Sequence, residues 1–300
     1  MTVDEMLTRF LTSKRAAGAA EPTLRWYSVQ LGLFVRWLES QPDQTLTAEL
    51  IENYLVHMRV RRSQIGDRRL SPASISSGAR ALRSFFAWGK AKGLLVANPM
   101  ADIRLKKPAA KEPRQAMRGE IDTLIRSIPL DNWVGLRDYL VVHVAFFCGL
   151  RVGEIVLLET QHFDIHQEVL RLPGGKTGGG VVPLIRDVIE AFMSYEHHRP
   201  AVAERRLFLS SDGHQRPLGP LTENGIRQML KRRCKEAGLR YLNPHSMRHG
   251  LAMFLLNERR VDASLVQRIL RHSNIRTTMG TYARWTQDAM ADEFRRKMER

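Results

Sequence analysis

The sequence predicts a mainly α-helical protein of two domains that carries one small antiparallel β-sheet. Three observations support this fold class. Apolar residues recur with a helical period through most of the chain, a proline-rich basic stretch interrupts that pattern at 98–118, and one segment at 162–185 alternates like β-strands around the sequence PGGKTGGG. A chain of 300 residues is also long enough to bury two hydrophobic cores.

Four amphipathic helices are expected in the first part of the chain. Their apolar residues recur at i, i+3 and i+4 within four segments: 3–14, 22–40, 47–60 and 71–93. The fourth segment has the clearest start, because Ser71 suits the N-cap and Pro72 suits the first helical position. The aromatic residues here are expected in the core rather than on a base-stacking surface: Trp26, Phe34, Trp37, Phe85 and Trp88.

The remainder of the chain predicts a linker and a second, mostly helical domain. Pro99, Pro108 and Pro113 remove the apolar periodicity from 98–118, so this stretch is expected to be an extended basic linker. Beyond it the sequence predicts the β-hairpin already mentioned and several helices. The clearest of these helices fall at 220–239, 245–259 and 262–272.

The charge balance indicates a polyanionic partner. Lys and Arg total 47 against 31 Asp and Glu, which gives a net charge of +16 and a pI near 10.5. Nucleic acid is the partner most typical of such a charge, while a solvated basic surface and an anionic membrane surface are the alternatives. The basic residues expected to contact DNA phosphates are Arg61, Arg62, Arg68, Arg69, Arg80, Arg83, Lys106 and Lys107.

Other sequence features exclude several classes of protein. Cys148 and Cys234 are too few for a disulfide framework or a cysteine metal cluster. The N-terminus lacks the apolar core of a signal peptide, and the longest apolar run, 139–150, is too short to span a bilayer. We therefore expect a cytoplasmic protein with no membrane partner.

Four short islands combine Arg, Lys, His and Tyr residues that could carry chemistry. Arg151 stands in the first with Glu154 at i+3, a spacing that allows an ion pair on one helix face. Lys176 occupies the glycine-rich loop of the predicted hairpin. That loop fails the nucleotide-binding P-loop pattern, because Leu170 stands where its first glycine is required.

The other two islands are rich in histidine. His245 and Arg248 lie one helical turn apart. His245 and His249 have the spacing of a metal pair, yet no third ligand is evident and no Glu lies between them, which argues against zinc. The fourth island places His272 ten residues before Tyr282.

The order Arg–Lys–His-x-x-Arg–His–Tyr in a basic two-domain chain resembles the tyrosine recombinase (phage integrase) family. GLRVGEIVLL resembles the first arginine box of that family, HSMRHGLAMFLL the second, and LRHSNIRTTMGTYA its final His-to-Tyr box. The resemblance implies a SAM-like core DNA-binding domain at 1–97, the linker at 98–118, and a catalytic domain at 119–300 whose segment 283–300 is a helix exchanged between subunits.

The resemblance also implies a role for each residue. Arg151 and Arg248 would hold the scissile phosphate, with His272 adding a hydrogen bond and Glu154 supporting Arg151. Lys176 would protonate the departing 5′ oxygen, His245 would act as an acid or base, and Tyr282 would be the nucleophile that forms a 3′-phosphotyrosyl link. Such chemistry requires neither a metal nor ATP.

The implied partners are double-stranded DNA with a specific site and three more copies of the chain, which form a tetramer on two paired sites. A chain that is monomeric when free is compatible with this assembly, and a partner recombinase or accessory protein stays open. Two further readings use the same residues: a type IB topoisomerase, and a catalytically silent DNA-binding regulator. The target sequence, and the choice among integration, excision and resolution, are also open.

Two positions and one spacing depart from the family pattern. Arg271 stands where glycine usually precedes the histidine of the final box, and Gly250 stands where Ser or Thr is common. The ten-residue spacing from His272 to Tyr282 is more typical of phage and mobile-element integrases than of enzymes that resolve chromosome dimers, which carry nine.

Overall fold

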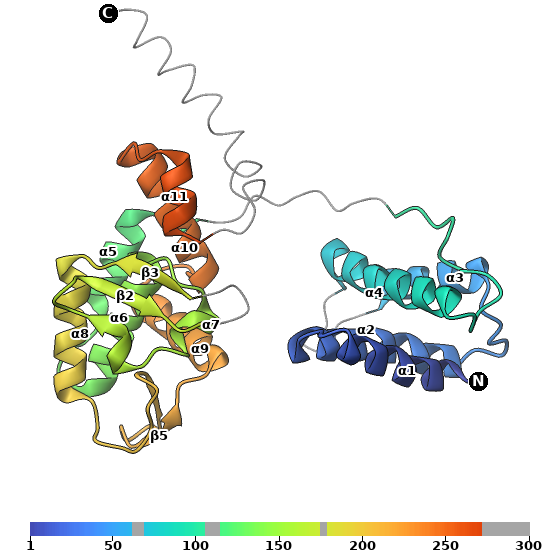
Figure 1. The fold of residues 1–300 in the computed structure, drawn as a ribbon, viewed down its shortest axis with the longest axis horizontal. Coiled ribbons are helices and arrows are strands. Elements are labelled where there is room, and N and C mark those ends of the chain that lie inside the picture. Colours follow the sequence, from blue (N-terminus) through green and yellow to red (C-terminus); the bar gives the residue numbers. More distant parts are fainter. Residues whose placement is uncertain (62–68, 106–114, 175–178, 272–300) are drawn as a thin grey trace, which may run out of the picture. The chain divides into compact units, whose positions relative to one another are not determined.

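The chain divides into two compact units, Met1–Lys111 and Glu112–Arg300, in the computed structural model (Figure 1). Each unit has its own hydrophobic core. The structure describes residues 1–61, 69–105, 115–174 and 179–271.

Within its described residues the first unit contains four helices: α1 (Val3–Ala16), α2 (Glu21–Glu39), α3 (Ala48–Val60) and α4 (Pro72–Ala91). They confirm the predicted helical segments. Ser71 caps α4 as expected, because its hydroxyl accepts a hydrogen bond of 3.1 Å from the backbone N–H of Ser74.

Aromatic side chains fill the core of the first unit. Phe10 of α1 meets Phe85 of α4 edge to face with ring centroids 5.4 Å apart. The indole N–H of Trp26 donates to the Ser77 hydroxyl at 3.1 Å, and that of Trp88 donates to the Ser13 hydroxyl at 3.0 Å. These tryptophans pack against the core and have satisfied N–H groups, so the prediction that they are core residues is confirmed.

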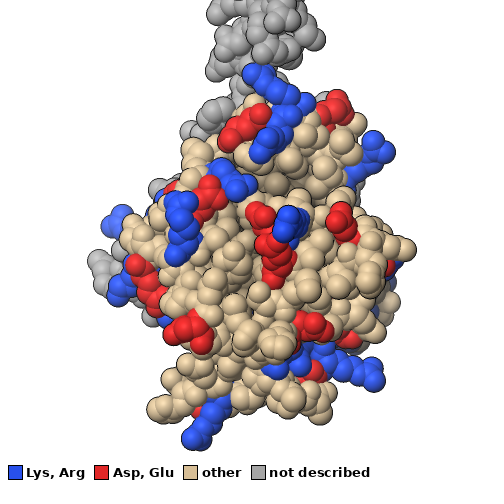
Figure 2. Space-filling view, turned by 90° about the vertical axis from the view of Figure 1, so that its left-hand side faces the viewer, with Lys and Arg blue, Asp and Glu red and all other residues tan. Residues whose placement is uncertain are grey.

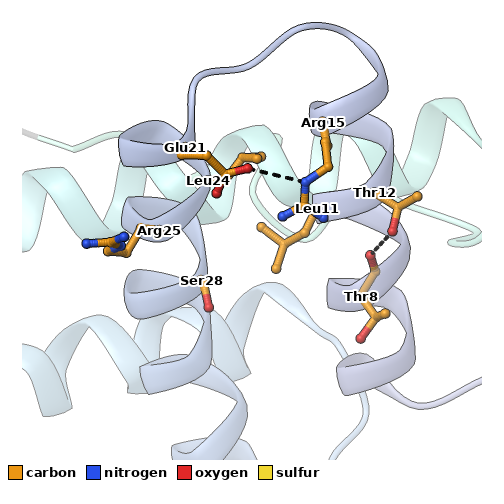
Figure 3. Close-up of a pocket in the computed structure, with 8 residues that line it drawn as sticks. All are labelled: Thr8, Leu11, Thr12, Arg15, Glu21, Leu24, Arg25 and Ser28. Atoms are coloured by element: carbon orange, nitrogen blue, oxygen red, sulfur yellow. Dashed lines mark hydrogen bonds and ion pairs between the residues drawn. The ribbon is translucent and has the colours of Figure 1, made fainter.

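A shallow groove of about 330 Å³ lies between α1 and α2 (Figure 3). Arg15 and Glu21 reach toward each other at its end near the helix connection, where the guanidinium Nε is 3.5 Å from the carboxylate Oε1. Both side chains are largely exposed, so this ion pair adds little stability. The groove belongs to the first unit alone.

The second unit combines helices with two small antiparallel sheets. Its described helices are α5 (Arg118–Ser127), α6 (Trp133–Phe146), α7 (Val152–Ile155), the short 3₁₀ turn Thr160–His162, α8 (Arg186–His198), α9 (Glu223–Glu236), α10 (Pro244–Met253), the π-helical turn Phe254–Glu258 and α11 (Ala263–Ile269). Its described strands are β1 (Phe163–Asp164), β2 (Val169–Leu172), β3 (Gly180–Pro183), β4 (Leu209–Ser211) and β5 (Pro217–Pro220).

The predicted hairpin is confirmed as β2 and β3, which pair in the register Leu170↔Val182 and Leu172↔Gly180, and β1 adds a third strand on the far side of β2. The β4–β5 hairpin was not predicted. The structure therefore confirms a mainly α-helical fold with small antiparallel sheets.

Helix α6 forms the centre of the second unit and packs against α8 and α10 (Figure 1). Nearly all of its side chains are buried, including the polar Arg137, Asp138 and His143, in agreement with the apolar run that begins at residue 139. The stacked rings of Phe163 and Phe192, 4.1 Å apart, join β1 to α8.

One buried carboxylate ties α6 to α9. Asp138 is fully buried, and its oxygens accept hydrogen bonds from Arg137, from Arg233 at 2.9 Å and from Arg232 at 3.1 Å. The arginines thus compensate a buried charge that would be costly if unpaired, and two of them link α9 to α6.

Candidate active site

The junction between α6 and α7 brings Arg151 to the end of α11. Gly149 turns the chain there with a left-handed φ of 58°, and a Cβ at this position would lie 2.7 Å from a methyl carbon of Leu270. Glycine is therefore required both by the backbone and by the close approach of α11. Two residues later Arg151 becomes the N-cap of α7.

Arg151 and Glu154 form the ion pair that their spacing predicts. The Arg151 Nη1 donates to Glu154 Oε1 at 2.9 Å, while the Arg151 backbone N–H donates to Oε2 at 2.7 Å. Burial alone would raise the pKa of Glu154. The backbone hydrogen bond and the charges of Arg271 and Arg151 outweigh burial and hold the pKa of this carboxyl below its usual value.

The Arg248 side chain extends from α10 into the same site, beside Arg151. Its side chain is buried, and its two terminal nitrogens donate to the backbone carbonyls of Gly149 and Leu270. Arg151 donates from Nη2 to the next carbonyl, that of Arg271, at 3.1 Å. Two guanidinium groups from distant parts of the sequence therefore meet at two consecutive carbonyls, directly before His272 in the chain.

Arg271 is the site residue whose contacts sequence reasoning missed. Helix α11 ends at Ile269, before the predicted end at His272, and Arg271 has a left-handed φ of 51°. Its Nη2 donates to Glu154 Oε2 at 2.9 Å. From the sequence, Arg271 in place of glycine is expected to perturb the end of the helix or to add a DNA contact, and nothing in the sequence indicates its contact with Glu154.

The second departure, Gly250, has a packing reason. A Cβ at Gly250 would lie 2.1 Å from the carbonyl oxygen of Ala116. The two segments are also joined by a hydrogen bond of 2.9 Å from the Ala116 N–H to the Ser246 carbonyl. The serine or threonine common here in the family would not fit this packing.

His245 lies in the first turn of α10, one turn before Arg248, and its side chain is exposed. His249 is half-buried, and burial lowers its pKa below the usual value. Among the described residues, no three His, Cys, Asp or Glu side chains come together in a way that could hold a metal ion. Cys148, beside the site, is fully buried, which raises the pKa of its thiol to about 12 and keeps it protonated.

Three of the predicted catalytic residues, Lys176, His272 and Tyr282, lie outside the described residues. Lys176 belongs to the sequence that connects β2 to β3, and Arg271 is the last described residue before His272. The described part of the site thus contains Arg151, Glu154, His245 and Arg248, together with Arg271.

The predicted DNA-binding residues lie in the first unit or its linker. Arg69, Arg80 and Arg83 are exposed and Arg61 is half-buried at the end of α3. Arg83 also donates to the backbone carbonyl of Ile103 at 2.9 Å, which gives it a structural contact. Four of these predicted residues lie outside the described part of the chain: Arg62, Arg68, Lys106 and Lys107.

Figure 2 shows the face of the second unit on which α8 lies. Acidic and basic side chains alternate there among a larger neutral surface. On α8 itself Arg186 is paired with Glu190 at 2.7 Å. The excess positive charge of the chain is therefore not gathered on this face. In the part of the chain that the structure describes, no helix has both the length and the apolar character needed to cross a membrane.

Comparison with known proteins identifies the family. The model of the phage integrase family matches residues 119–288, and that of the phage integrase N-terminal SAM-like domain matches residues 6–94. The chain belongs to the phage integrase family, and the prediction of a tyrosine recombinase is confirmed.

Relatives and solved structures agree with this membership. The chain is 28% identical over 284 residues to tyrosine recombinase XerC of Xanthomonas axonopodis pv. citri, covering 92% of this chain and 90% of the relative. It is 28% identical over 281 residues to tyrosine recombinase XerD of Listeria monocytogenes, covering 91% of each.

The fold resembles that of the Tn1549 transposon integrase in complex with transposon right end DNA. The TM-score is 0.72 at 20% identity, covering 97% of this chain and 100% of the other. It also resembles lambda integrase bound to DNA, with a TM-score of 0.68 at 18% identity, covering 91% of this chain and 92% of the other.

Proposed function

We propose that this recombinase cuts and rejoins double-stranded DNA at a specific site through a covalent 3′-phosphotyrosyl bond to Tyr282. One observation carries the proposal. Arg151 and Arg248 converge on the carbonyls of Leu270 and Arg271, immediately before the sequence that holds His272 and Tyr282. Paired guanidinium groups suit a phosphate, because they are always charged and present several N–H donors in one plane.

Arg151 has side-chain N–H donors that its described contacts do not use and that could bind the phosphate. Arg151 commits one side-chain N–H to Glu154 and one to the Arg271 carbonyl, out of the five that an arginine has. The remaining donors would bind a non-bridging phosphate oxygen. Because Arg151 and Arg248 are fixed by their other contacts, little reorganisation is needed when charge grows on the pentacovalent phosphorus.

The proposed reaction conserves the phosphodiester bond energy. The Tyr282 oxygen attacks phosphorus and loses its proton, the P–O5′ bond breaks, and Lys176 donates a proton to the departing 5′ oxygen. His272 adds a hydrogen bond to the phosphate, and His245 accepts the proton that Tyr282 loses. Attack by a 5′ hydroxyl on the phosphotyrosine reverses these steps and rejoins the strand. We therefore propose that neither a metal nor ATP takes part.

DNA is the partner that the charge and the family support. The net charge of +16 favours a polyanion, and Arg80 and Arg83 expose two guanidinium groups one turn apart on α4. We propose that four copies assemble on two paired sites, with residues 283–300 exchanged between subunits. The target sequence would be selected from a random duplex library by binding.

A nicked duplex of the selected site tests the proposal. The nick lets the cut end diffuse away, so the covalent adduct accumulates and is seen on a denaturing gel. In the presence of EDTA we expect an adduct with wild type and with Tyr241→Phe, a matched tyrosine control in the same unit, and none with Tyr282→Phe. An adduct that persists in Tyr282→Phe would refute the mechanism.

The adduct assay, together with relaxation and strand-exchange assays on supercoiled DNA, separates the alternatives. A regulator would bind the site and form no adduct. A topoisomerase would relax supercoiled DNA that carries one site, whereas a recombinase would exchange strands only between two sites.

A further inference from the structure

Glu154 is held by two arginines, not one. Its Oε1 accepts from Arg151 Nη1 at 2.9 Å, and its Oε2 accepts from Arg271 Nη2 at 2.9 Å as well as from the Arg151 backbone N–H. The Arg271 carbonyl in turn accepts from Arg151 Nη2 at 3.1 Å. These contacts close a ring in which each of the three residues touches the other two.

Arg271 changes the charge of this centre. Arg151, Arg248 and Arg271 place three guanidinium charges against the single carboxylate of Glu154. Without Arg271, Glu154 would neutralise Arg151 and leave only one net positive charge for an incoming phosphate. The Arg271 side chain is largely buried, so its charge is weakly screened by solvent.

Arg271 occupies its position at a cost to folding. Its φ of 51° is a left-handed conformation that glycine adopts without strain and a residue with a side chain does not. Its Nε is buried and has no hydrogen-bond partner among the described residues. A strained backbone and an unsatisfied donor at one residue point to a role in function.

We propose that Arg271 is a positioning residue for DNA cleavage: it holds Glu154 Oε2 while Arg151 Nη1 holds Oε1, and so fixes the guanidinium of Arg151 in one orientation with its charge available to the phosphate. This inference rests on the proposed function. Arg271 acts through Glu154, so its loss affects the cleavage step more than DNA binding.

Gly180, the first residue of β3, offers a second way to disturb Arg271. A Cβ added to Gly180 would lie 2.7 Å from Arg271 Cδ, too close for both to remain in place. Gly180→Ala would therefore displace the Arg271 side chain while leaving its charge in the protein.

The test measures the single-turnover rate of adduct formation at saturating nicked duplex, together with the Kd for the intact site. We expect Arg271→Gly to slow adduct formation about tenfold, within the range of coupling between residues in contact, with an unchanged Kd. Arg271→Lys should recover part of the rate, and Gly180→Ala should also slow it. Glu168→Gly is the matched control, because it relieves a similar φ of 53° outside the site and should cleave at the wild-type rate.

A double variant decides whether Arg271 acts through Glu154. Arg271→Gly combined with Glu154→Gln should be no slower than Glu154→Gln alone, because both remove one linked unit. Independent, multiplicative effects would overturn the positioning role, as would a wild-type rate for Arg271→Gly. If wild type itself binds its site and forms no adduct, the proposed function fails, and this inference fails with it.

Discussion

Arg248 donates a hydrogen bond from α10 to the carbonyl of Gly149, the residue whose left-handed turn leads into Arg151. One buried guanidinium therefore fixes the loop that carries the other. The two arginines are linked a second time at the end of α11, where Arg248 binds the carbonyl of Leu270 and Arg151 binds that of the next residue, Arg271.

Replacing Arg248 by lysine should separate charge from geometry. Lysine keeps the positive charge but lacks the planar fork that reaches the carbonyls of Gly149 and Leu270 together. We expect cleavage of the nicked duplex to fall about 10²-fold, the size typical of losing one oriented donor to a developing charge. The Kd for DNA, measured by fluorescence anisotropy, should change little. Wild-type cleavage by Arg248→Lys would show that charge alone suffices.

Gly149→Ala should destabilise the second unit. The new methyl must adopt a φ of 58° and lies 2.7 Å from Leu270, so strain and overpacking add. We expect a loss of about 2–4 kcal/mol in the free energy of unfolding. Urea unfolding followed by circular dichroism measures this loss.

Gly119→Ala is the matched control. Gly119 lies in α5, where an added Cβ meets nothing within 4 Å, so alanine should be neutral or stabilising by about 0.5–1 kcal/mol. Equal effects at Gly119 and Gly149 would contradict the packing argument.

Asp138→Ala should be more damaging than any surface charge removal. The carboxylate is fully buried and accepts hydrogen bonds from three arginines, so its loss leaves the buried guanidinium of Arg137 without a carboxylate to balance its charge. We expect about 3–5 kcal/mol of destabilisation by urea unfolding. Glu190→Ala, which breaks the exposed pair with Arg186, should have almost no effect. A loss as small for Asp138 as for Glu190 would show that the buried cluster adds no stability.

The lowered pKa of Glu154 predicts a dependence of stability on pH. Because the folded carboxyl has a lower pKa than its ordinary value of 4.5, the unfolded chain binds a proton first as pH falls. The stabilisation is thus fully present above about pH 4.5 to 5 and is lost as pH falls through the folded pKa. Between pH 7 and pH 4, the free energy of unfolding should fall less steeply in Glu154→Gln than in wild type. Parallel curves for the two proteins would contradict this assignment.

Local patterns predicted much of the fold. The apolar stripes of α1–α4, the N-cap Ser71 and the β2–β3 hairpin around its glycines are all determined by residues close together in the sequence. They could therefore be predicted from the sequence alone. The β4–β5 hairpin was missed because β5 has the sequence PLGP, whose two prolines and glycine are atypical of a strand. The Asp212–Gly213 pair between them is a turn signal that could have revealed it.

Long-range contacts account for what the sequence did not predict. The pairing of Arg151 with Glu154 follows from a spacing of three, whereas Arg271 meets Glu154 across 117 residues. The convergence of Arg248 on Gly149 and Leu270 likewise depends on how α6, α10 and α11 pack. Asp138 begins an apolar run, and nothing local indicates that Arg232 and Arg233 reach it from α9.

The central claim is that Tyr282 carries the DNA strand. Mass spectrometry of the protease-digested covalent complex tests it most directly. We predict one peptide from residues around 282 whose mass is increased by a nucleotide attached through a 3′ phosphate to Tyr282. A nucleotide attached to any other residue, or an unmodified Tyr282 in protein that has cut its DNA, would contradict the account.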